Sequence, residues 1–325
     1  MIIITGPTAS GKSTLGLQLA QRIGGAIIAA DSRTVYKELS IGAGKVTTEY
    51  AAIRRESAVG PVYDIEGVPH YGIDLVTLDT TYTVAQYQEY VASVLPTIAR
   101  AGRVPILLGG SGLYVDAVRL GYRFPEKVSV PQDWVNRTLS ELVHELQRDD
   151  PKTAATIDIR NRRRVERALA YVQATGASFL TAQRRSAGHQ HSLYVVDRLR
   201  TELYEGIDAR VDARMASGML EEVRALVAAG YEDRLLGLGL EYRILTQFLL
   251  GQIPSIDVAV RTLKYAIHGF ARRQLSWWRS RPDAIWISSY TALEACVLQL
   301  SKGGGCARDG SVILRGGTRC DAGRC

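Results

Sequence analysis

The chain has 325 residues, of which 46% are hydrophobic and 22% are charged. This composition supports a large folded core without disulfides or a structural metal, and no apolar stretch approaches the ~20 residues that a membrane-spanning helix needs. The net charge is +7, and 33 of the 40 basic residues are Arg. Because Arg pairs with phosphates and stacks on bases, a polyanionic partner has to be considered. The N-terminus lacks the pattern of a secretory signal, so we expect a cytoplasmic protein.

Residues 1–125 alternate between apolar runs and helical patterns. We predict strands at Met1–Thr5, Ala26–Ala30 and Val104–Leu108, and helices at Lys12–Ile23 and Tyr82–Arg100. Strands and helices that alternate with short connections imply parallel strands joined by right-handed crossovers. This segment is therefore predicted to be the first part of a P-loop α/β fold, a three-layer core with a parallel sheet.

The remaining chain is mostly helical in pattern. Residues 126–190 are rich in charge and helix formers, and we interpret them as a helical insertion domain. Residues 191–300 are expected to complete the core, with a strand candidate at Tyr194–Val196 that returns to the sheet. Residues 301–325 are rich in Gly and Arg with few apolar side chains, so we expect a disordered tail there.

A Gly-rich turn between the first strand and the first helix carries a phosphate-binding motif. The sequence G-P-T-A-S-G-K-S fits the pattern G-x-x-x-x-G-K-[ST] in the required strand–turn–helix context. Its members are Gly6, Pro7, Thr8, Ala9, Ser10, Gly11, Lys12 and Ser13. Backbone N–H groups and the helix N-terminus would bind phosphate oxygens, Lys12 would add a full charge, and the Ser13 hydroxyl can ligate Mg²⁺. A diphosphate or triphosphate is therefore expected to bind here.

The most strand-like run after the phosphate loop lacks the strand-end carboxylate with which NTP-hydrolysing P-loop proteins hold Mg²⁺. Val104–Leu108 ends in Gly-Gly-Ser, and the carboxylate stands instead at Asp31, after the strand that follows the P-loop helix. Because parallel strands share one crevice at their carboxyl ends, Asp31 should face the same ligand as the phosphate loop. It is better placed to touch the acceptor of a transferred group than the metal. The alternative is a plain turn residue, since Asp-Ser is a common turn pair.

Several segments together resemble the tRNA dimethylallyltransferases, also called tRNA isopentenyltransferases. In chain order they are the phosphate loop, D-S-R-T-V-Y from Asp31, I-G-A-G-K from Ile41, P-H-Y-G-I-D from Pro69, G-G-S-G-L-Y from Gly109, N-R-R-R-V-E-R-A-L from Asn161, G-L-E-Y-R from Gly239 and R-R-Q-L-S-W from Arg272. These ordered matches are far more specific than the phosphate loop alone. The chain departs from the family at Gly44, Val46 and Thr34, where Ala, Pro and Gln are usual. The departures beside Lys45 concern the lid over the donor.

The resemblance implies the transfer of a dimethylallyl group from dimethylallyl diphosphate to N6 of adenosine 37, beside the anticodon, in tRNAs that read codons beginning with U. The products are N6-(dimethylallyl)adenosine and diphosphate. In the family the phosphate loop holds the prenyl diphosphate and Mg²⁺, and no ATP is consumed, which agrees with the absent strand-end carboxylate. The resemblance also implies a monomer that binds the anticodon stem-loop of tRNA and does not bind membranes.

The resemblance assigns roles to residues of this chain. Asp31 would accept the N6 proton as general base, Ser111 would orient the amine, and Lys12 would stabilise the charge that builds on the departing diphosphate. The diphosphate-binding set comprises the eight residues of the phosphate-binding motif together with Thr14 and Arg210. From its pattern alone, Arg210 is an exposed helix residue.

A further set of residues matches the family's tRNA contacts. It comprises Asp31, Ser32, Arg33, Thr34, Arg137, Asn161, Arg162, Arg163, Arg164, Val165, Leu238, Gly239, Leu240, Glu241, Tyr242 and Arg243. The adenine would have to flip out of its stack to reach the donor. Adjacent arginines cannot all point the same way on a helix, so at most two of Arg162, Arg163 and Arg164 should reach phosphates. The alternative for all three is a solvated helix face.

The residues alone leave three other functions open. A free-nucleotide isopentenyltransferase, acting on AMP, ADP or ATP, would not need the insertion at 126–190 or its basic block. A P-loop small-molecule kinase would need adenine-clamping features and a pair of lid arginines, which Arg162–Arg164 could imitate. A non-catalytic RNA-binding module would not need an intact phosphate loop. Trp277 and Trp278 are predicted to be core residues, and the role of His70 stays open.

Overall fold

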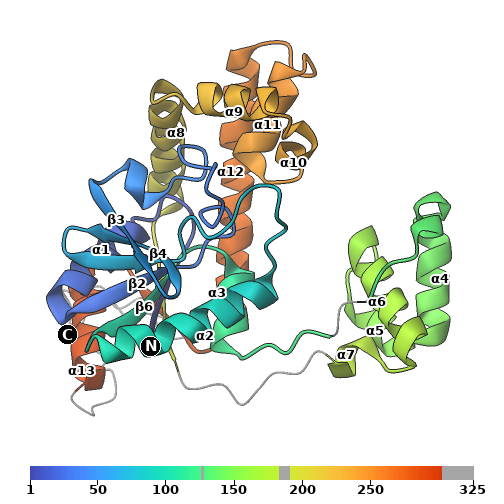
Figure 1. Ribbon diagram of the computed structural model, residues 1–325, viewed down its shortest axis with the longest axis horizontal. Helices are drawn as coiled ribbons and strands as arrows, with labels where there is room; N and C mark the ends of the chain where they lie inside the picture. Colours follow the sequence, from blue (N-terminus) through green and yellow to red (C-terminus); the bar gives the residue numbers. More distant parts are fainter. Residues whose placement is uncertain (126–127, 183–190, 302–325) are drawn as a thin grey trace. The chain divides into compact units, whose positions relative to one another are not determined.

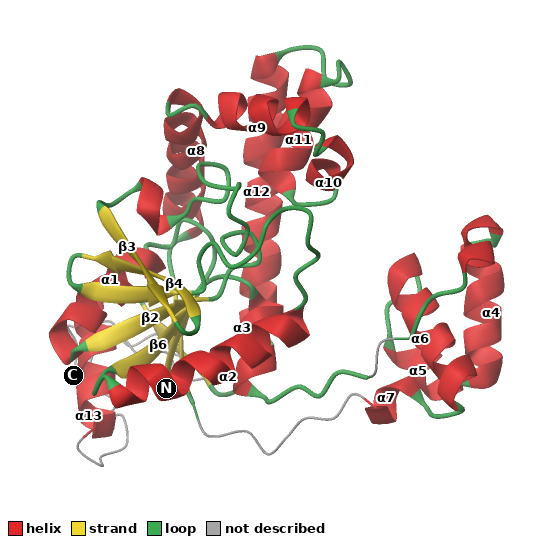
Figure 2. Cartoon of the chain, in the orientation of Figure 1, coloured by secondary structure: helices red, strands yellow, loops and turns green. Residues whose placement is uncertain are grey.

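The computed structural model describes residues 1–125, 128–182 and 191–301. The chain forms two compact units: Asp116–Gln190 is one, and the segments before and after it together make the other. Figure 1 follows the chain by colour from its N-terminus. Figure 2 shows that the strands of the described residues all belong to the larger unit, which is formed by the segments before and after Asp116–Gln190.

An eight-stranded sheet forms the centre of the larger unit. In spatial order its strands are β3 (Ala52–Ser57), β4 (Gly60–Ile65), β5 (Val68–Tyr71), β2 (Gly25–Ala29), β6 (Val104–Leu108), β1 (Ile2–Thr5), β7 (Ser192–Val196) and β8 (Ala284–Ile287). The strands from β5 to β8 in this order run parallel, and Ile3 of β1 stands opposite Leu107 of β6 and Leu193 of β7. At the other edge β3 and β4 form an antiparallel hairpin. The prediction of a parallel sheet is therefore correct for its centre and wrong for this edge.

Helices cover both faces of the sheet, as the predicted three-layer core requires. The helices of the larger unit are α1 (Lys12–Ile23), α2 (Val84–Arg100), α3 (Gly112–Arg119, whose end enters the smaller unit), α8 (Arg200–Ala216), α9 (Met219–Ala228), α10 (Glu232–Leu236), α11 (Leu240–Leu249), α12 (Ile256–Arg279) and α13 (Tyr290–Ser301), with a 3-10 turn η1 (Val46–Thr48). Ile4, Leu19 and Leu293 belong to one core between the sheet, α1 and α13. Because strand side chains alternate, Ile3 and Ile28 point to the opposite face, where α2 contacts β6.

A second core lies among α8, α9, α11 and α12. It buries Ile207 of α8, Val223 of α9 and Leu245 of α11 together with Tyr36 from the segment after β2. Gly218 separates α8 from α9 with a left-handed backbone at φ 95°, a conformation that glycine adopts without steric cost. This core brings residues of α8 and α11 next to the carboxyl end of β2.

Helices make up the regular secondary structure of the smaller unit in its described residues. It contains η2 (Gln132–Asn136), α4 (Leu139–Asp149), α5 (Pro151–Thr156), α6 (Arg162–Thr175) and α7 (Phe179–Ala182). Leu142 and Leu146 of α4 pack against Val165 and Leu169 of α6 in a core of their own. The unit starts at Asp116, before the expected insertion boundary at residue 126. The predicted tail lies, from residue 302 on, outside the described residues.

Two strand segments differ from the sequence-based expectation. The β3–β4 hairpin has no apolar signal in its outer strand, where Arg54, Arg55 and Glu56 are exposed. β8 is a four-residue strand inside a stretch that was expected to be helical.

Trp278 is fully buried, as predicted, whereas Trp277 is half-buried with Arg281 over its ring. None of the helices in the described ranges combines the length and apolar character that a bilayer-spanning segment requires.

Candidate active site

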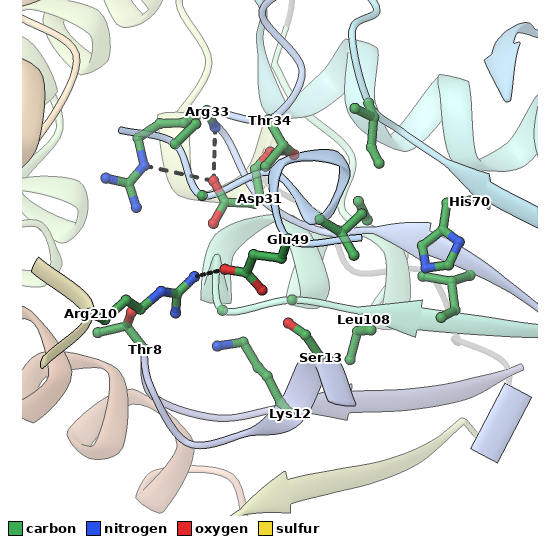
Figure 3. Close-up of a pocket in the computed structure, with 18 of the residues that line it drawn as sticks. Thr8, Lys12, Ser13, Asp31, Arg33, Thr34, Glu49, His70, Leu108 and Arg210 are labelled. Carbon is green, nitrogen blue, oxygen red and sulfur yellow. Dashed lines mark hydrogen bonds and ion pairs between the residues drawn. The ribbon is translucent and has the colours of Figure 1, made fainter. Parts of the chain in front are cut away.

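The candidate site is a pocket of the larger unit, at the carboxyl ends of β1, β2 and β6 (Figure 3). From the residues singled out in the sequence, its lining includes Thr8, Lys12, Ser13, Asp31, Arg33, Thr34, Arg210 and Glu241. They come from the phosphate loop, the turn after β2, the middle of α8 and the start of α11. Asp31 and the phosphate loop thus line one pocket, as the parallel arrangement of their strands predicts.

The phosphate loop presents N–H groups and a lysine to this pocket. Ala9 and Gly11 adopt left-handed backbone conformations with φ of 60° and 81°, which turn the loop sharply. The Lys12 ammonium donates to the Pro7 carbonyl oxygen at 3.1 Å. α1 begins without a side-chain cap, so its first N–H groups can bind an anion. Within the described residues, the exposed Ser13 hydroxyl has no hydrogen-bond partner.

Other members of the motif hold the loop against β7. A Cβ atom at Gly6 would come within 3.0 Å of the Val196 carbonyl oxygen, so the close approach requires glycine. The Arg198 side chain donates from Nε to the Ser10 carbonyl oxygen at 3.3 Å. Thr14 is exposed in the first turn of α1. These contacts fix the loop backbone whose amides would meet a phosphate.

Positive charge is concentrated in the pocket. Lys12, Arg33, Arg210 and Arg214 all line it. Desolvation in the pocket, followed by the positive charge of Arg210, lowers the pKa of Lys12 to about 8. The same two causes lower the pKa of Arg214 to about 10. Burial and, after it, mutual repulsion thus both disfavour the charged forms of these side chains, so an anion bound among them would be strongly stabilised.

Asp31 forms a turn and lines the pocket at the same time. Its Oδ1 accepts a hydrogen bond from the Arg33 backbone N–H at 2.9 Å and lies 3.8 Å from Arg33 Nε. Within the described residues its Oδ2 has no partner. Ser111 follows β6 and supports the turn, because its hydroxyl accepts from the Ser32 N–H at 3.1 Å and its own N–H donates to the Ala30 carbonyl at 3.2 Å. The interpretation of Asp31 as a plain turn residue therefore accounts for Oδ1. Oδ2 can still accept a proton from a substrate.

Glu241 binds two of the pocket arginines. Its carboxylate is 4% exposed and forms ion pairs with Arg33 and, at 3.8 Å, with Arg214. Desolvation would lower the pKa of Arg33, but Glu241 and Asp31 outweigh it and raise this pKa above its usual value. Thr34 donates from its hydroxyl to the Asp31 carbonyl oxygen at 3.3 Å. Two predicted tRNA contacts, Arg33 and Glu241, are thus bound to each other.

The rest of the Leu238–Arg243 segment differs in exposure. Tyr242 is buried, Leu238, Gly239 and Leu240 are half-buried, and Arg243 is exposed. The Tyr242 hydroxyl donates to Glu222 at 2.8 Å, and the same carboxylate accepts the backbone N–H groups of residues 40–42 at 2.7–3.2 Å. Tyr242 therefore stabilises the loop after β2 through Glu222. Arg243 is the member of this segment that is exposed to solvent.

Arg210 lies in the pocket and is one-third exposed. Its Nη2 is 3.6 Å from a carboxylate oxygen of Glu49, and its buried Nε has no partner in the described part of the chain. Gly44 packs against this arginine and against Arg214: its φ is +62°, and a Cβ atom there would overlap the Arg214 guanidinium. The departure from Ala at position 44 is therefore matched by the position of Arg214.

Lys45 is not a lid residue. It is 1% exposed, and its ammonium donates to the carbonyl oxygens of Tyr36 (2.7 Å) and Lys37 (3.1 Å) and to the carboxylate of Asp74. The neighbouring Gly44 does line the pocket, as does Val46. The departures beside Lys45 thus alter the pocket wall, while Lys45 itself fixes the loop from behind.

The pocket becomes apolar away from its charged end. Ile27, Ile73 and Leu108 line this part, together with His70, which Figure 3 shows on the side away from Arg210. His70 is 3% exposed, and its Nδ1 lies 2.9 Å from the Val68 carbonyl oxygen. Burial lowers the pKa of His70, so the ring is neutral at pH 7. The pocket can therefore accept a small ligand with one charged and one apolar end.

Gln274 is a residue of the site that the sequence did not assign. Its Oε1 accepts the Thr8 N–H at 2.9 Å, and its Nε2 donates to the Gly110 carbonyl oxygen at 2.9 Å. It thereby joins the phosphate loop to the segment after β6. Gln274 stands in the R-R-Q-L-S-W segment, but its partners lie 266 and 164 residues away in the chain. The match of this segment to the family motif was the one signal in the sequence for Gln274, and that match did not indicate what the residue does.

The smaller unit uses part of its basic segment internally. The Arg162 guanidinium donates to the carbonyl oxygens of Trp134 and Arg137 and pairs with Glu166 at 2.6 Å. The Arg137 guanidinium pairs with Glu145 at 2.6 Å. Arg162 therefore stabilises the unit itself, and its charge is shared with a carboxylate.

The other predicted RNA contacts of this unit have different surroundings. Asn161 caps α6, because its side chain accepts the Arg164 N–H at 3.3 Å. Val165 is fully buried in the core of the unit. Arg163 and Arg164 are exposed. Arg163 and Arg164 are thus available to a phosphate backbone. From the spacing of adjacent residues on a helix, we expected at most two of the three arginines to reach phosphates.

Together these features define what the pocket can do. A diphosphate would bind the α1 N-terminus, Lys12 and Arg210, and an attached hydrocarbon would extend into the apolar part. Positive charge in this place stabilises a diphosphate as it leaves. Asp31 could accept a proton from a nucleophile that enters beside Ser111.

Comparisons with known proteins point to the same chemistry. A family model described as IPP transferase matches residues 34–281, and one described as isopentenyl transferase matches residues 1–56. A tRNA dimethylallyltransferase from Exiguobacterium is 35% identical over 297 residues, which cover 88% of this chain and 89% of the relative. The full-length tRNA isopentenylpyrophosphate transferase from Bacillus halodurans gives a TM-score of 0.66 at 28% identity, with 93% and 95% of the chains covered. A eukaryotic dimethylallyltransferase that acts on tRNA shares the fold, with a TM-score of 0.75 at 20% identity over 95% and 81% of the chains.

Proposed function

Because the chain belongs to the IPP transferase family, we propose that it is a tRNA dimethylallyltransferase that modifies N6 of adenosine 37 in tRNAs reading codons that begin with U. The donor is dimethylallyl diphosphate, and the products are N6-(dimethylallyl)adenosine and diphosphate. The observation that carries this proposal is a single pocket in which a phosphate loop, an apolar end and the carboxylate of Asp31 converge.

The donor is held by its two chemically different ends. Its diphosphate binds the backbone amides of the phosphate loop, Lys12 and Arg210, whose buried Nε lacks a partner in the described residues. Its five-carbon tail enters the apolar part beside Ile27 and Leu108. Ser13 would hold Mg²⁺, since its hydroxyl lines the pocket and makes no other hydrogen bond in the described structure. The ion, when bound, neutralises part of the diphosphate charge.

The chemical step exchanges one bond for another. The bond between C1 of the donor and the bridging oxygen breaks, and its electron pair leaves with the diphosphate. Lys12 and Arg210 stabilise the negative charge that develops there. A bond forms between C1 and N6 of the adenine, and Asp31 takes the N6 proton, which raises the nucleophilicity of the amine. The Ser111 hydroxyl lies beside the Asp31 turn and orients the acceptor.

The acceptor is an RNA, and the two units contribute to its recognition in different ways. An adenine stacked in an anticodon loop has to flip out to reach Asp31. In the smaller unit, Arg163 and Arg164 are exposed and would bind phosphates of the anticodon stem-loop. We further propose that the protein is a monomer, and that it acts in the cytoplasm because its substrate is tRNA.

Mass spectrometry of the RNA product tests this function. The purified protein is incubated with Mg²⁺, dimethylallyl diphosphate and an unmodified anticodon stem-loop carrying adenosines at positions 36–38, without ATP. A gain of one dimethylallyl group, lost when the adenosine at position 37 is replaced, is the expected result. A gain with AMP but not with RNA would instead identify a free-nucleotide enzyme. No gain with either acceptor would refute prenyl transfer, and ATP-dependent phosphorylation of a small molecule would then favour a kinase.

A further inference from the structure

Three carboxylates line the pocket, and two of them are committed to neighbouring groups. Glu241 is 4% exposed and forms ion pairs with both Arg33 and Arg214. Asp31 accepts the Arg33 N–H in its turn. The third carboxylate, Glu49, is in a different position: within the described residues it forms an ion pair with Arg210, at 3.6 Å, and its charge also acts on Arg214. This distance is longer than a hydrogen bond, so the pair is held by charge alone.

The backbone that carries Glu49 is fixed, while its side chain is free to move. Glu49 ends the 3-10 turn η1, and its N–H donates to the Val46 carbonyl oxygen at 3.1 Å. The turn is tied down at its start, where the Thr48 hydroxyl donates to the Lys45 carbonyl oxygen at 2.7 Å and Lys45 is itself buried. The Glu49 side chain, in contrast, is 46% exposed. A change of rotamer can therefore remove its carboxylate from Arg210 without any movement of the loop.

Arg210 is the group for which Glu49 and a diphosphate would compete. Figure 3 shows the Glu49 carboxylate pointing at Arg210, on the side of the pocket where Lys12 and Thr8 lie. Arg210 also lowers the pKa of Lys12, which places its charge next to the phosphate loop. Its buried Nε has no acceptor in the described part of the chain. The Arg210 guanidinium therefore has N–H donors that the distant Glu49 carboxylate does not use, and a diphosphate, with more oxygen atoms, could accept hydrogen bonds from them.

We propose that Glu49 is an internal competitor of the diphosphate. Resting on the function proposed above, the inference is that Glu49 pairs with Arg210 until a diphosphate takes its place, and returns to Arg210 when the product diphosphate leaves. The carboxylate lowers the affinity for diphosphate in two ways: it occupies a ligand group, and it repels the ligand's negative charge. Glu49 is thereby a residue that sets the affinity of the site for diphosphate.

Titration calorimetry with inorganic diphosphate at one pH, run once with Mg²⁺ and once without it, tests this proposal without prenyl transfer. Glu49→Gln should bind diphosphate about two- to fivefold more tightly than the wild-type protein, the range expected when a partly exposed ion pair is removed. Glu56→Gln is the matched control, because Glu56 is an exposed carboxylate that pairs with Arg54 on β3. It changes the net charge by the same amount and should leave the affinity unchanged.

A double-mutant cycle identifies the partner. In an Arg210→Gln background, which should itself bind diphosphate more weakly, Glu49→Gln should lose most of its effect. An unchanged affinity of Glu49→Gln would overturn the proposal, as would a gain of equal size in Glu56→Gln. An affinity that falls in Glu49→Gln only when Mg²⁺ is present would overturn it too and would make Glu49 a metal ligand. If the wild-type protein binds no diphosphate at all, the proposed function fails, and this inference fails with it.

Discussion

Raising the pH from 7 to 9 should weaken the binding of dimethylallyl diphosphate about tenfold, because it removes the proton from Lys12. Desolvation and the neighbouring Arg210 lower the pKa of Lys12 to about 8. The charged ammonium is therefore present in roughly nine-tenths of the molecules at pH 7 and in roughly one-tenth at pH 9. Of the two forms of Lys12, only the charged ammonium attracts the diphosphate. The affinity for the donor is therefore highest below pH 8 and falls as the pH rises through that value.

Other groups contribute little over this range. A phosphate ester loses its second proton near a pKa of about 6, so the charge of the donor is nearly constant above pH 7. Arg214, with a pKa of about 10, stays mostly charged up to pH 9. The tenfold loss corresponds to about 1.4 kcal/mol of binding free energy, and it comes from one titrating side chain.

Titration calorimetry at pH 7, 8 and 9 in two buffers of different ionisation enthalpy measures both the affinity and the proton exchange. Bound diphosphate raises the pKa of Lys12 again, so binding at pH 9 should take up about one proton per molecule and binding at pH 7 almost none. Lys12→Arg keeps its charge at every pH tested and should show little dependence on pH. A tenfold loss that persists in Lys12→Arg would refute the assignment of this titration to Lys12.

Three further outcomes are expected. Asp31→Asn keeps the oxygen that accepts the Arg33 N–H but cannot act as a base, so single-turnover rates should fall by about 10²–10⁴ while filter-binding affinity for the stem-loop stays the same; an equal loss of both would make Asp31 a structural residue only. Gln274→Leu removes two hydrogen bonds, so urea denaturation should show a loss of roughly 2 kcal/mol in unfolding free energy and calorimetry a weaker donor affinity, and an unchanged unfolding midpoint would contradict this. Replacing Arg163 and Arg164 by Gln should reduce the salt dependence of stem-loop binding by about two charges, whereas Arg162→Gln should mainly lower stability; salt slopes that change equally in both variants would show that this division is wrong.

The part of the site near the phosphate loop can be predicted from the sequence because its signals are local. The apolar run, the Gly-rich turn and the helix that follows it occupy consecutive residues, and α1 has the predicted bounds Lys12–Ile23. A general property of parallel sheets then extends the prediction to Asp31, which ends the next strand. No comparable rule reaches the β3–β4 hairpin, since its outer strand is exposed and charged on both faces.

The electrostatic partners in the pocket depend on contacts between distant segments. Arg33 and Glu241 are 208 residues apart in the chain, and Thr8 and Gln274 are 266 residues apart. The first pair forms because the core around α8, α11 and α12 packs against the loop after β2, and the second because the phosphate loop packs against the same core through Ala9. A sequence motif identifies these residues as a set, but it does not indicate that Glu241 binds arginines inside the protein rather than facing an RNA.

Gly44 shows how a departure from a family motif can be understood once its surroundings are known. From the sequence, Gly in place of Ala is one of the departures that concern the lid over the donor. In the structure the backbone at Gly44 is left-handed, and the Arg214 guanidinium lies where a methyl group would project. An Ala at this position would strain the backbone and displace Arg214 toward Arg210 or away from Glu241, and so change the charge that surrounds a diphosphate. The identity of residue 44 and the position of Arg214 are therefore coupled.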